Sequence, residues 1–331
     1  MEQKTQFSKI KNITTGVLFA FLLTFSFIIP LQPQSISHSD NMTTQNRAEE
    51  KGVVSSIPNL ENFFSDLVIA ADSAFVWDMK NQRILFEKKA NKVAPLASIT
   101  KMIAAVITLE LAPANTEIRI QREFLEAEGD SGLYVDERWL LKDLLDFSLV
   151  SSSNDGFRAI ASVVGAISAG TDDPRKGRQK FIEKINQKAQ ELNLENTVVY
   201  DETGLDQNKS QSGAYSTAKE TALFFQYILR EHPEILEPTD NKELSFISLS
   251  NKHHTATNTN LIAKKVPGMI GAKTGYTDLA GGNLVTVFDS GLGQPIIIVV
   301  LGSSIEERFT DTEKLIGAAR SFIIEEKNSS W

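Results

Sequence analysis

The sequence predicts an α/β fold in which one antiparallel sheet, built from both chain ends, is flanked by helices and carries an inserted, mainly helical subdomain. Three observations support this prediction. Residues 73–89 alternate like strands, the middle of the chain has helical periodicity, and the last hundred residues return to strands before one closing helix. The 331 residues fit one large domain or two modest ones. A sheet must be covered by packed elements, so we expect the helices to cover it.

The first half of this pattern begins with strands and continues with helices. The stretch SAFVWDMKNQRILFEKK, residues 73–89, predicts two strands around a turn at residues 80–82. Apolar residues then recur at helical spacing after Ser98 until Pro113. A further apolar-periodic stretch covers Trp139 to Val150.

The second half alternates helices with a closing group of strands. Ser216 resembles a helix N-cap, and the sequence DSGLGQ at residues 289–294 would turn the last two strands. Asp172, Asp173 and Pro174 favour a helix start rather than a calcium site. The predicted helices are 157–167, 181–194, 216–230 and 305–325, and the predicted strands are 268–274, 283–288 and 295–301.

Residues 1–37 have the pattern of a signal peptide or an uncleaved membrane anchor. Three lysines precede an apolar run at residues 13–31, whose 19 residues approach the length of a membrane span. Either interpretation places the rest of the chain outside the cytoplasmic membrane, anchored by this segment or secreted. Residues 38–66 are polar and predict a linker, and residues 67–327 predict the folded domain.

Composition excludes several classes of function. With 34 basic and 42 acidic residues the net charge is −8, so no broad basic surface and no nucleic-acid partner are expected. The chain has no cysteine, which excludes disulfides, thiolate nucleophiles and thiolate metal sites. His253 and His254 are predicted to lie in a loop rather than to bind a metal. We therefore expect no metal and no cofactor.

Other acidic side chains are interpreted as solvent-facing. Asp143 and Asp146 lie on a predicted helix and are expected to face solvent. A second group has no EF-hand spacing and predicts a solvated face or the rim of a groove. Its members are Glu126, Glu128, Asp130, Asp136 and Glu137.

Ser98-Ile99-Thr100-Lys101 is the first of three short motifs that indicate chemistry. Positions i and i+3 share one face of a helix, so the Lys101 amine lies within reach of the Ser98 hydroxyl. A serine hydroxyl becomes a strong nucleophile when a base takes its proton. A lysine can be that base if burial or other cations lower its pKa. At a helix amino terminus, the backbone N–H of Ser98 also points toward a developing oxyanion.

The other two motifs are Ser152-Ser153-Asn154 and Lys273-Thr274-Gly275. Ser152 could relay a proton and Asn154 could bind a substrate amide, although capping of the next helix explains the same residues. Lys273 is a second cation near Lys101, and a lysine with a threonine hydroxyl suits a terminal carboxylate. A glycine within a strand often marks a close approach by a ligand. All three motifs together are typical of class A β-lactamases and penicillin-binding proteins.

The chain resembles the D-alanyl-D-alanine carboxypeptidases, which are low-molecular-mass penicillin-binding proteins with the β-lactamase/DD-peptidase fold. The resemblance covers about residues 71–324 through PLASITKM, DETGLDQNKSQSGAYSTAKETA, GAKTGYTDLAGGNLV and LGSSIEERFTDTEKLI. It implies that residues 67–327 form a DD-peptidase catalytic domain, without the carboxy-terminal β domain of many relatives.

The resemblance also implies residue roles. Ser98 would be the acyl-ester nucleophile and Lys101 its proton acceptor, with Ser152 and Asn154 as the second catalytic element. The backbone N–H groups of Ser98 and Tyr276 would form the oxyanion hole. The implied substrate-binding residues are Lys273, Thr274, Gly275, Tyr276 and Arg308.

The implied reaction is removal of the terminal D-alanine from a peptidoglycan pentapeptide, with β-lactams as inhibitors. Three alternatives remain open: a DD-endopeptidase, a β-lactamase, and a non-catalytic sensor of muropeptides or β-lactams. The usual E-x-x-L-N pattern of class A β-lactamases is not found between Asn154 and Lys273, because Ala189 stands where the acid would precede Leu192-Asn193.

Overall fold

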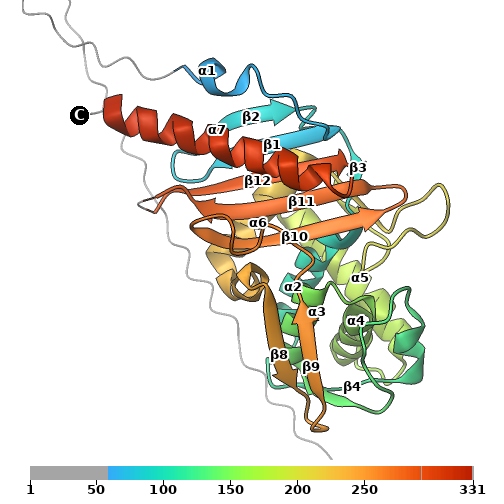
Figure 1. Cartoon of the computed structure of the whole chain (residues 1–331). Helices are drawn as coiled ribbons and strands as arrows, with labels where there is room; N and C mark the ends of the chain where they lie inside the picture. The colour runs from blue at the N-terminus through green and yellow to red at the C-terminus, as the bar shows by residue number, and fades with distance from the viewer. Residues whose placement is uncertain (1–58, 292, 330–331) are drawn as a thin grey trace, which may run out of the picture. The chain divides into compact units, whose positions relative to one another are not determined.

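A five-stranded antiparallel sheet forms the centre of the computed structural model, which describes residues 59–291 and 293–329. The first strand pairs with the last, from Ser73 opposite Leu301 to Asp78 opposite Ile296. Both ends of the chain therefore share one sheet, as the sequence predicted (Figure 1). The strands in spatial order are β10 (Met269–Thr277), β11 (Gly281–Asp289), β12 (Pro295–Ser303), β1 (Ser73–Asp78) and β2 (Arg83–Lys88).

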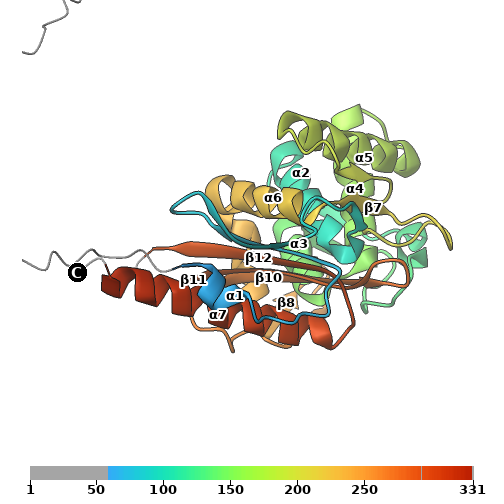
Figure 2. The same cartoon turned by 90° about the horizontal axis from the view of Figure 1, so that it is seen from above.

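Helices cover both faces of the sheet (Figures 1 and 2). One face packs on the closing helix α7 (Glu307–Ser329), and the other packs on α6 (Ala218–Glu231) and α2 (Thr100–Leu111). Successive strand residues point to opposite faces, so Leu284 joins the α7 side while Val285 joins the α6 side. The buried, apolar strand residues follow from this double covering, and the predicted fold class is confirmed.

A mainly helical insertion separates β2 from β10. Its helices include α3 (Leu141–Ser151), α4 (Asn154–Ala169) and α5 (Pro174–Glu191). Helices α4 and α5 approach closely at two glycines: a Cβ on Gly165 would lie 2.0 Å from the Gly177 carbonyl oxygen. Asp173 caps α5 and Pro174 opens it, so this helix begins before the predicted residue 181.

Short elements complete the insertion and its borders. Helix α6 is capped by Thr217 rather than by Ser216, which belongs to strand β7. The short strands are β3 (Ala94–Pro95), β4 (Glu117–Arg119), β5 (Arg138–Leu140), β6 (Val198–Val199) and β7 (Ala214–Ser216). The 3-10 helices are η1 (Ala97–Ile99), η2 (Arg122–Glu126), η3 (Pro233–Ile235) and η4 (Glu237–Asp240).

The loop expected around His253 and His254 is instead a β-hairpin, formed by β8 (Glu243–Ile247) and β9 (His253–Thr257). His253 is exposed, whereas His254 is buried and contacts Glu137, with 2.6 Å between His254 Nε2 and Glu137 Oε1. The expectation of a solvated face or groove rim is therefore wrong for Glu137. Asp143 and Asp146, which were expected to face solvent, are only partly exposed, and the Lys142 Nζ lies 2.6 Å from Asp146 Oδ2.

The segment before β1 takes part in the fold. Helix α1 (Glu61–Phe64) falls in the stretch predicted as linker, and its Phe64 is buried with residues of α7 and the sheet. The predicted signal peptide or anchor and most of the predicted linker lie outside the described residues. Within the described part of the chain, no helix has the length and apolar character needed to cross a membrane.

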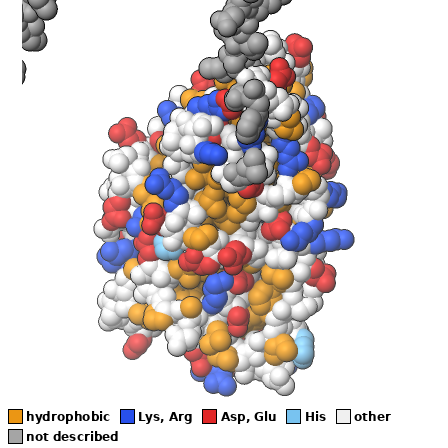
Figure 3. Space-filling view, turned by 90° about the vertical axis from the view of Figure 1, so that its left-hand side faces the viewer, with side chains coloured by type: hydrophobic (Ala, Val, Ile, Leu, Met, Phe, Trp, Pro, Cys, Tyr) orange, Lys and Arg blue, Asp and Glu red, His pale blue; other side chains and the backbone are white. Residues whose placement is uncertain are grey.

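Charges of both signs share the face seen in Figure 3, where acidic and basic side chains surround hydrophobic ones. On the described part of this face no broad basic area is visible.

Candidate active site

Ser98 and Lys101 lie one turn apart where η1 continues into α2. The Lys101 Nζ donates a hydrogen bond to the Ser98 Oγ at 2.8 Å. Ser98 is partly exposed, whereas the Lys101 side chain is fully buried. The pairing predicted from the i, i+3 spacing is therefore present in the structure.

Two further acceptors hold the Lys101 amine. Its Nζ donates to Asn154 Oδ1 at 2.7 Å and to the Thr203 carbonyl oxygen at 3.0 Å. Burial lowers the pKa of Lys101 to about 7, although the nearby charges of Asp201 and Glu202 act in the opposite direction. An amine with this pKa is partly neutral near pH 7, so it can accept the proton of the Ser98 hydroxyl.

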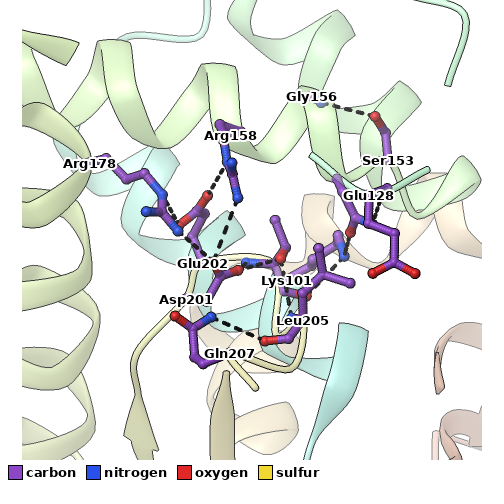
Figure 4. Close-up of polar contacts among 12 residues, drawn as sticks. Lys101, Glu128, Ser153, Gly156, Arg158, Arg178, Asp201, Glu202, Leu205 and Gln207 are labelled. Atoms are coloured by element: carbon purple, nitrogen blue, oxygen red, sulfur yellow. Dashed lines mark hydrogen bonds and ion pairs between the residues drawn. The ribbon is translucent and has the colours of Figure 1, made fainter. Parts of the chain in front are cut away.

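The tripeptide Ser152-Ser153-Asn154 joins the end of α3 to the start of α4. Ser152 adopts the left-handed conformation with φ 59°, which turns the chain out of α3. Ser153 caps α4 by accepting the Gly156 N–H at 2.9 Å (Figure 4). Asn154 Nδ2 donates to the Glu128 carbonyl oxygen at 2.6 Å, which fixes the side chain that faces Lys101. Within the same motif, Ser153 therefore caps the helix, whereas Asn154 contacts Lys101.

Strand β10 brings Lys273 and Thr274 to the same place. The Lys273 Nζ donates to Ser152 Oγ at 2.8 Å and to the Thr274 carbonyl oxygen at 2.9 Å. The Ser152 hydroxyl is therefore bound by Lys273, while Lys101 binds Asn154. Thr274 Oγ1 lies 2.5 Å from Thr259 Oγ1.

Gly275 lets β10 approach the start of η1. A Cβ at this position would lie 2.8 Å from the Leu96 carbonyl oxygen and 3.1 Å from the Ser98 nitrogen. The backbone after Lys273 therefore runs directly beside the Ser98 N–H, and the Tyr276 side chain is 48% exposed. The assignment of the Ser98 and Tyr276 N–H groups as oxyanion donors remains a prediction.

Arg308 enters the site from α7. Its Nη1 donates to the Gly275 carbonyl oxygen at 2.8 Å. Burial, together with the charges of Lys101 and Arg308, holds the pKa of Lys273 well below its usual value. Two lysine amines and one guanidinium near one another favour a ligand that carries a negative charge, because an anion would stabilise the protonated forms of the lysines.

Two parts of the site were not identified from the sequence. Asn283 Nδ2 donates to the carbonyl oxygens of Pro95 and Leu96, at 2.9 and 3.1 Å, and so anchors the backbone that leads to Ser98. The loop at residues 201–204 supplies the Thr203 carbonyl to Lys101. The only sequence signal for this loop was that DETGLDQNKSQSGAYSTAKETA is typical of the resembled family.

The fold and the three converging motifs define a serine enzyme of the β-lactamase/DD-peptidase class. Residues 61–304 match the family described as D-alanyl-D-alanine carboxypeptidase. The chain therefore belongs to that family, and the resemblance noted in its sequence is confirmed.

Similar proteins agree with this assignment. The D-alanyl-D-alanine carboxypeptidase DacF of Bacillus subtilis is 27% identical, and the match covers 78% of this chain and 64% of that protein. The D-alanyl-D-alanine endopeptidase of Escherichia coli is 25% identical, over 85% of this chain and 81% of that protein. The crystal structure of Penicillin-Binding Protein D2 from Listeria monocytogenes in its ampicillin-bound form is 27% identical, with a TM-score of 0.64 over 76% of this chain and 98% of that one.

Proposed function

We propose that this chain is a serine-type D-Ala-D-Ala carboxypeptidase, which removes the terminal D-alanine of peptidoglycan stem peptides through an acyl-enzyme on Ser98. The proposal rests on one observation above all. A fully buried lysine amine with a pKa of about 7 donates to the partly exposed Ser98 hydroxyl at 2.8 Å. A serine hydroxyl beside a base of this kind is an activated nucleophile.

Acylation would proceed in two proton transfers. Lys101, in its neutral form, accepts the Ser98 proton while the Ser98 Oγ forms a bond to the carbonyl carbon between the two D-alanines. The backbone N–H groups of Ser98 and Tyr276 would stabilise the resulting oxyanion, each by about 3 kcal/mol. The C–N bond then breaks, and the proton reaches the leaving amine through the Ser152 hydroxyl. Water afterwards hydrolyses the ester and frees Ser98.

The substrate carboxylate would bind at the cationic end of the site. Lys273, Thr274 and Arg308 lie there, with the Arg308 guanidinium on the Gly275 carbonyl. Asn154 would hold the amide beside the scissile bond while its Oδ1 keeps Lys101 in place. A terminal carboxylate would thus select the end of a stem peptide over an internal bond.

β-Lactams are proposed as inhibitors because the same site would accept their carboxylate and strained amide. The Listeria monocytogenes protein, which shares this fold, has been crystallised with ampicillin bound and with cefotaxime bound. We infer that a β-lactam acylates Ser98 of this chain and that residues 67–327 form the catalytic domain. We also propose that residues 1–37 export or anchor the protein, so that this domain works outside the cytoplasmic membrane.

Replacement of Ser98 tests the proposed function. Ser98→Ala should abolish both covalent labelling by a fluorescent penicillin and release of D-alanine from a pentapeptide ending in D-Ala-D-Ala. Ser65→Ala, at an exposed serine of the same chain, should leave both unchanged. Labelling that persists in Ser98→Ala would contradict the assignment. Labelling without D-alanine release in the unchanged protein would favour a sensor.

The endopeptidase alternative has a specific observation in its favour, which is the similarity to the endopeptidase of Escherichia coli. Treating purified muropeptides with the protein and weighing the products by mass spectrometry separates the two reactions. A carboxypeptidase shortens pentapeptides by one alanine, whereas an endopeptidase converts cross-linked dimers to monomers. Rapid, repeated hydrolysis of a penicillin would instead indicate a β-lactamase.

A further inference from the structure

Two arginines and two carboxylates form an ionic cluster beside Lys101 (Figure 4). Arg178 of α5 binds both acids, with its Nε 2.8 Å from Glu202 Oε2 and its Nη2 2.5 Å from Asp201 Oδ2. Arg158 of α4 lies on the same pair at longer range, 3.5 Å from Glu202 Oε1 and 3.7 Å from Asp201 Oδ2. The side chains of Asp201 and Glu202 are 4% and 0% exposed, so both carboxylates are shielded from solvent.

The cluster is joined to Lys101 by a continuous chain of hydrogen bonds. Asp201 Oδ1 accepts the Thr203 N–H at 2.8 Å and also the Thr203 hydroxyl. The Thr203 carbonyl then accepts the Lys101 amine at 3.0 Å. Gly204, at φ 79°, rests on the η1 backbone, where a Cβ would lie 2.0 Å from the Ala97 carbonyl oxygen. The loop at residues 201–204 therefore touches the start of the Ser98 helix as well as Lys101.

The helices that carry the arginines are themselves fixed. Gly177, the residue before Arg178, approaches α4 so closely that a Cβ would lie 2.2 Å from the Ser162 carbonyl oxygen. Helix α4 also begins at Asn154, another acceptor for Lys101, and Arg158 follows four residues later on the same side of the helix. Two of the three groups that hold the Lys101 amine thus depend on the α4–α5 pair.

We propose that Arg158 and Arg178 are positioning residues for acylation: by holding Asp201 and Glu202, they place the Thr203 carbonyl on the Lys101 amine and offset the two negative charges beside it. This inference rests on the proposed function, because it assigns the arginines to the base of that reaction. Neither arginine contacts Ser98, so they act through Lys101.

The charges beside Lys101 act on it in a definite direction. Asp201 and Glu202 each favour the ammonium form of Lys101. Burial and the neighbouring Asp201 raise the pKa of Glu202, and Arg178 opposes this. If Arg178 is replaced, two carboxylates face one guanidinium, and the surplus negative charge disfavours the neutral amine. The charged groups beside Lys101 are Asp201 and Glu202, with Arg158 and Arg178 bound to that pair, and Lys273, whose own neighbour is Arg308.

The test is the pH profile of Ser98 acylation by a fluorescent penicillin, measured from pH 5 to 9 on the full chain. The unchanged protein should gain rate with rising pH through about 7, where Lys101 loses its proton. This rising part of the profile is its limb, and its midpoint is the pH of half-maximal rate. Arg178→Gln should move the midpoint of the limb upward by about half to one pH unit, which lowers the rate at pH 7 about two- to fivefold. Arg175→Gln, an exposed arginine on the same helix, is the matched control and should not move it.

Glu202→Gln gives the opposite sign. It keeps the shape of the side chain and removes one negative charge, so the limb should move downward. The double variant Arg178→Gln/Glu202→Gln should return the limb toward that of the unchanged protein. A fold that merely needs these ion pairs for stability would lower the amount of active protein without moving the midpoint of the limb.

Three results would overturn the inference: an unmoved limb in folded Arg178→Gln, a limb that moves upward or not at all in Glu202→Gln, or no recovery in the double variant. If Arg178→Gln does not fold, Glu202→Gln alone decides. Failure of the proposed function looks different, because the unchanged protein would then show no acylation of Ser98 by mass spectrometry at any pH.

Discussion

At the scale of single residues, the site depends on a lysine kept in an unfavourable environment. Burial is the larger effect on Lys101 and lowers its pKa to about 7, whereas the carboxylates of Asp201 and Glu202 pull the other way. Three acceptors satisfy the hydrogen bonds of the amine. Burial therefore disfavours the charged form of Lys101 without leaving its N–H groups unpaired. Such a group is a poor choice for stability and a good one for a base near neutral pH.

Gly275 provides a residue-scale prediction. Gly275→Ala would place a methyl group 2.8 Å from the Leu96 carbonyl oxygen and 3.1 Å from the Ser98 nitrogen, so β10 must shift away from η1. We expect penicillin acylation to fall by about 10²- to 10³-fold through misplacement of the oxyanion donors. The measurement is the second-order rate of labelling.

Gly317→Ala is the matched control for this change. Gly317 lies in α7, and a methyl group added there would meet no neighbouring atom within 4 Å. The substitution should therefore stabilise the helix by about 0.5–1 kcal/mol and leave acylation unchanged. Equal acylation rates for Gly275→Ala and the unchanged protein would show that the close approach of β10 has no part in the reaction.

At the scale of elements, the hairpin β8–β9 shows where a buried polar pair holds a structure. His254 packs on Trp139 and Phe147, with ring centroids 4.8 and 5.8 Å away, and bonds Glu137 at 2.6 Å. His254→Ala should remove about 3 kcal/mol from the free energy of unfolding, because it empties the aromatic cluster and leaves the buried Glu137 without this partner. Urea denaturation measures the change.

His253→Ala offers a control from the adjacent position of the same strand. The His253 side chain is exposed, and its loss should change the free energy of unfolding by no more than about 0.5 kcal/mol. Similar losses for the two variants would mean that the hairpin is held by its backbone pairing alone.

The same hairpin shows why part of the fold could not be read from the sequence. In β9 the inward positions are His254 and Ala256, so the alternation that marks a strand is carried by one polar and one small residue. The strands β11 and β12 were predicted because most of their buried residues are apolar, whereas β10 combines apolar residues with the buried Lys273 and Thr274. An apolar pattern was therefore enough to predict the central sheet. The hairpin lacks such a pattern and was missed.

Some parts of the candidate site could be predicted from the sequence and others could not. Ser98 and Lys101 could be paired from sequence because helical spacing fixes their separation. The ionic cluster could not, because Arg178 lies 24 residues from Glu202 and no local pattern relates them. Backbone contributions, such as the Thr203 carbonyl, carry no side-chain signature at all.

At the scale of the whole molecule, the site combines residues that lie far apart along the chain. Residues from α2, the α3–α4 junction, β10 and α7 line it, and α7 also holds the segment that leads into β1. Asp311 of α7 accepts the N–H groups of Ala70 and Ala71 at 3.0 and 2.8 Å, three residues after Arg308 contacts Gly275. The closing helix therefore links the start of the folded chain to the site.

Two deletions of the amino-terminal segment test this linkage. A chain that begins at residue 59 keeps α1 and every contact described above, so it is the reference for the second deletion. A chain that begins at residue 73 loses Phe64 and Ile69, each 6% exposed, and removes both backbone donors from Asp311. Unfolding by urea should then need less free energy by on the order of 4 kcal/mol. Equal stability of the two shortened chains would mean that α7 holds the sheet without the segment before β1.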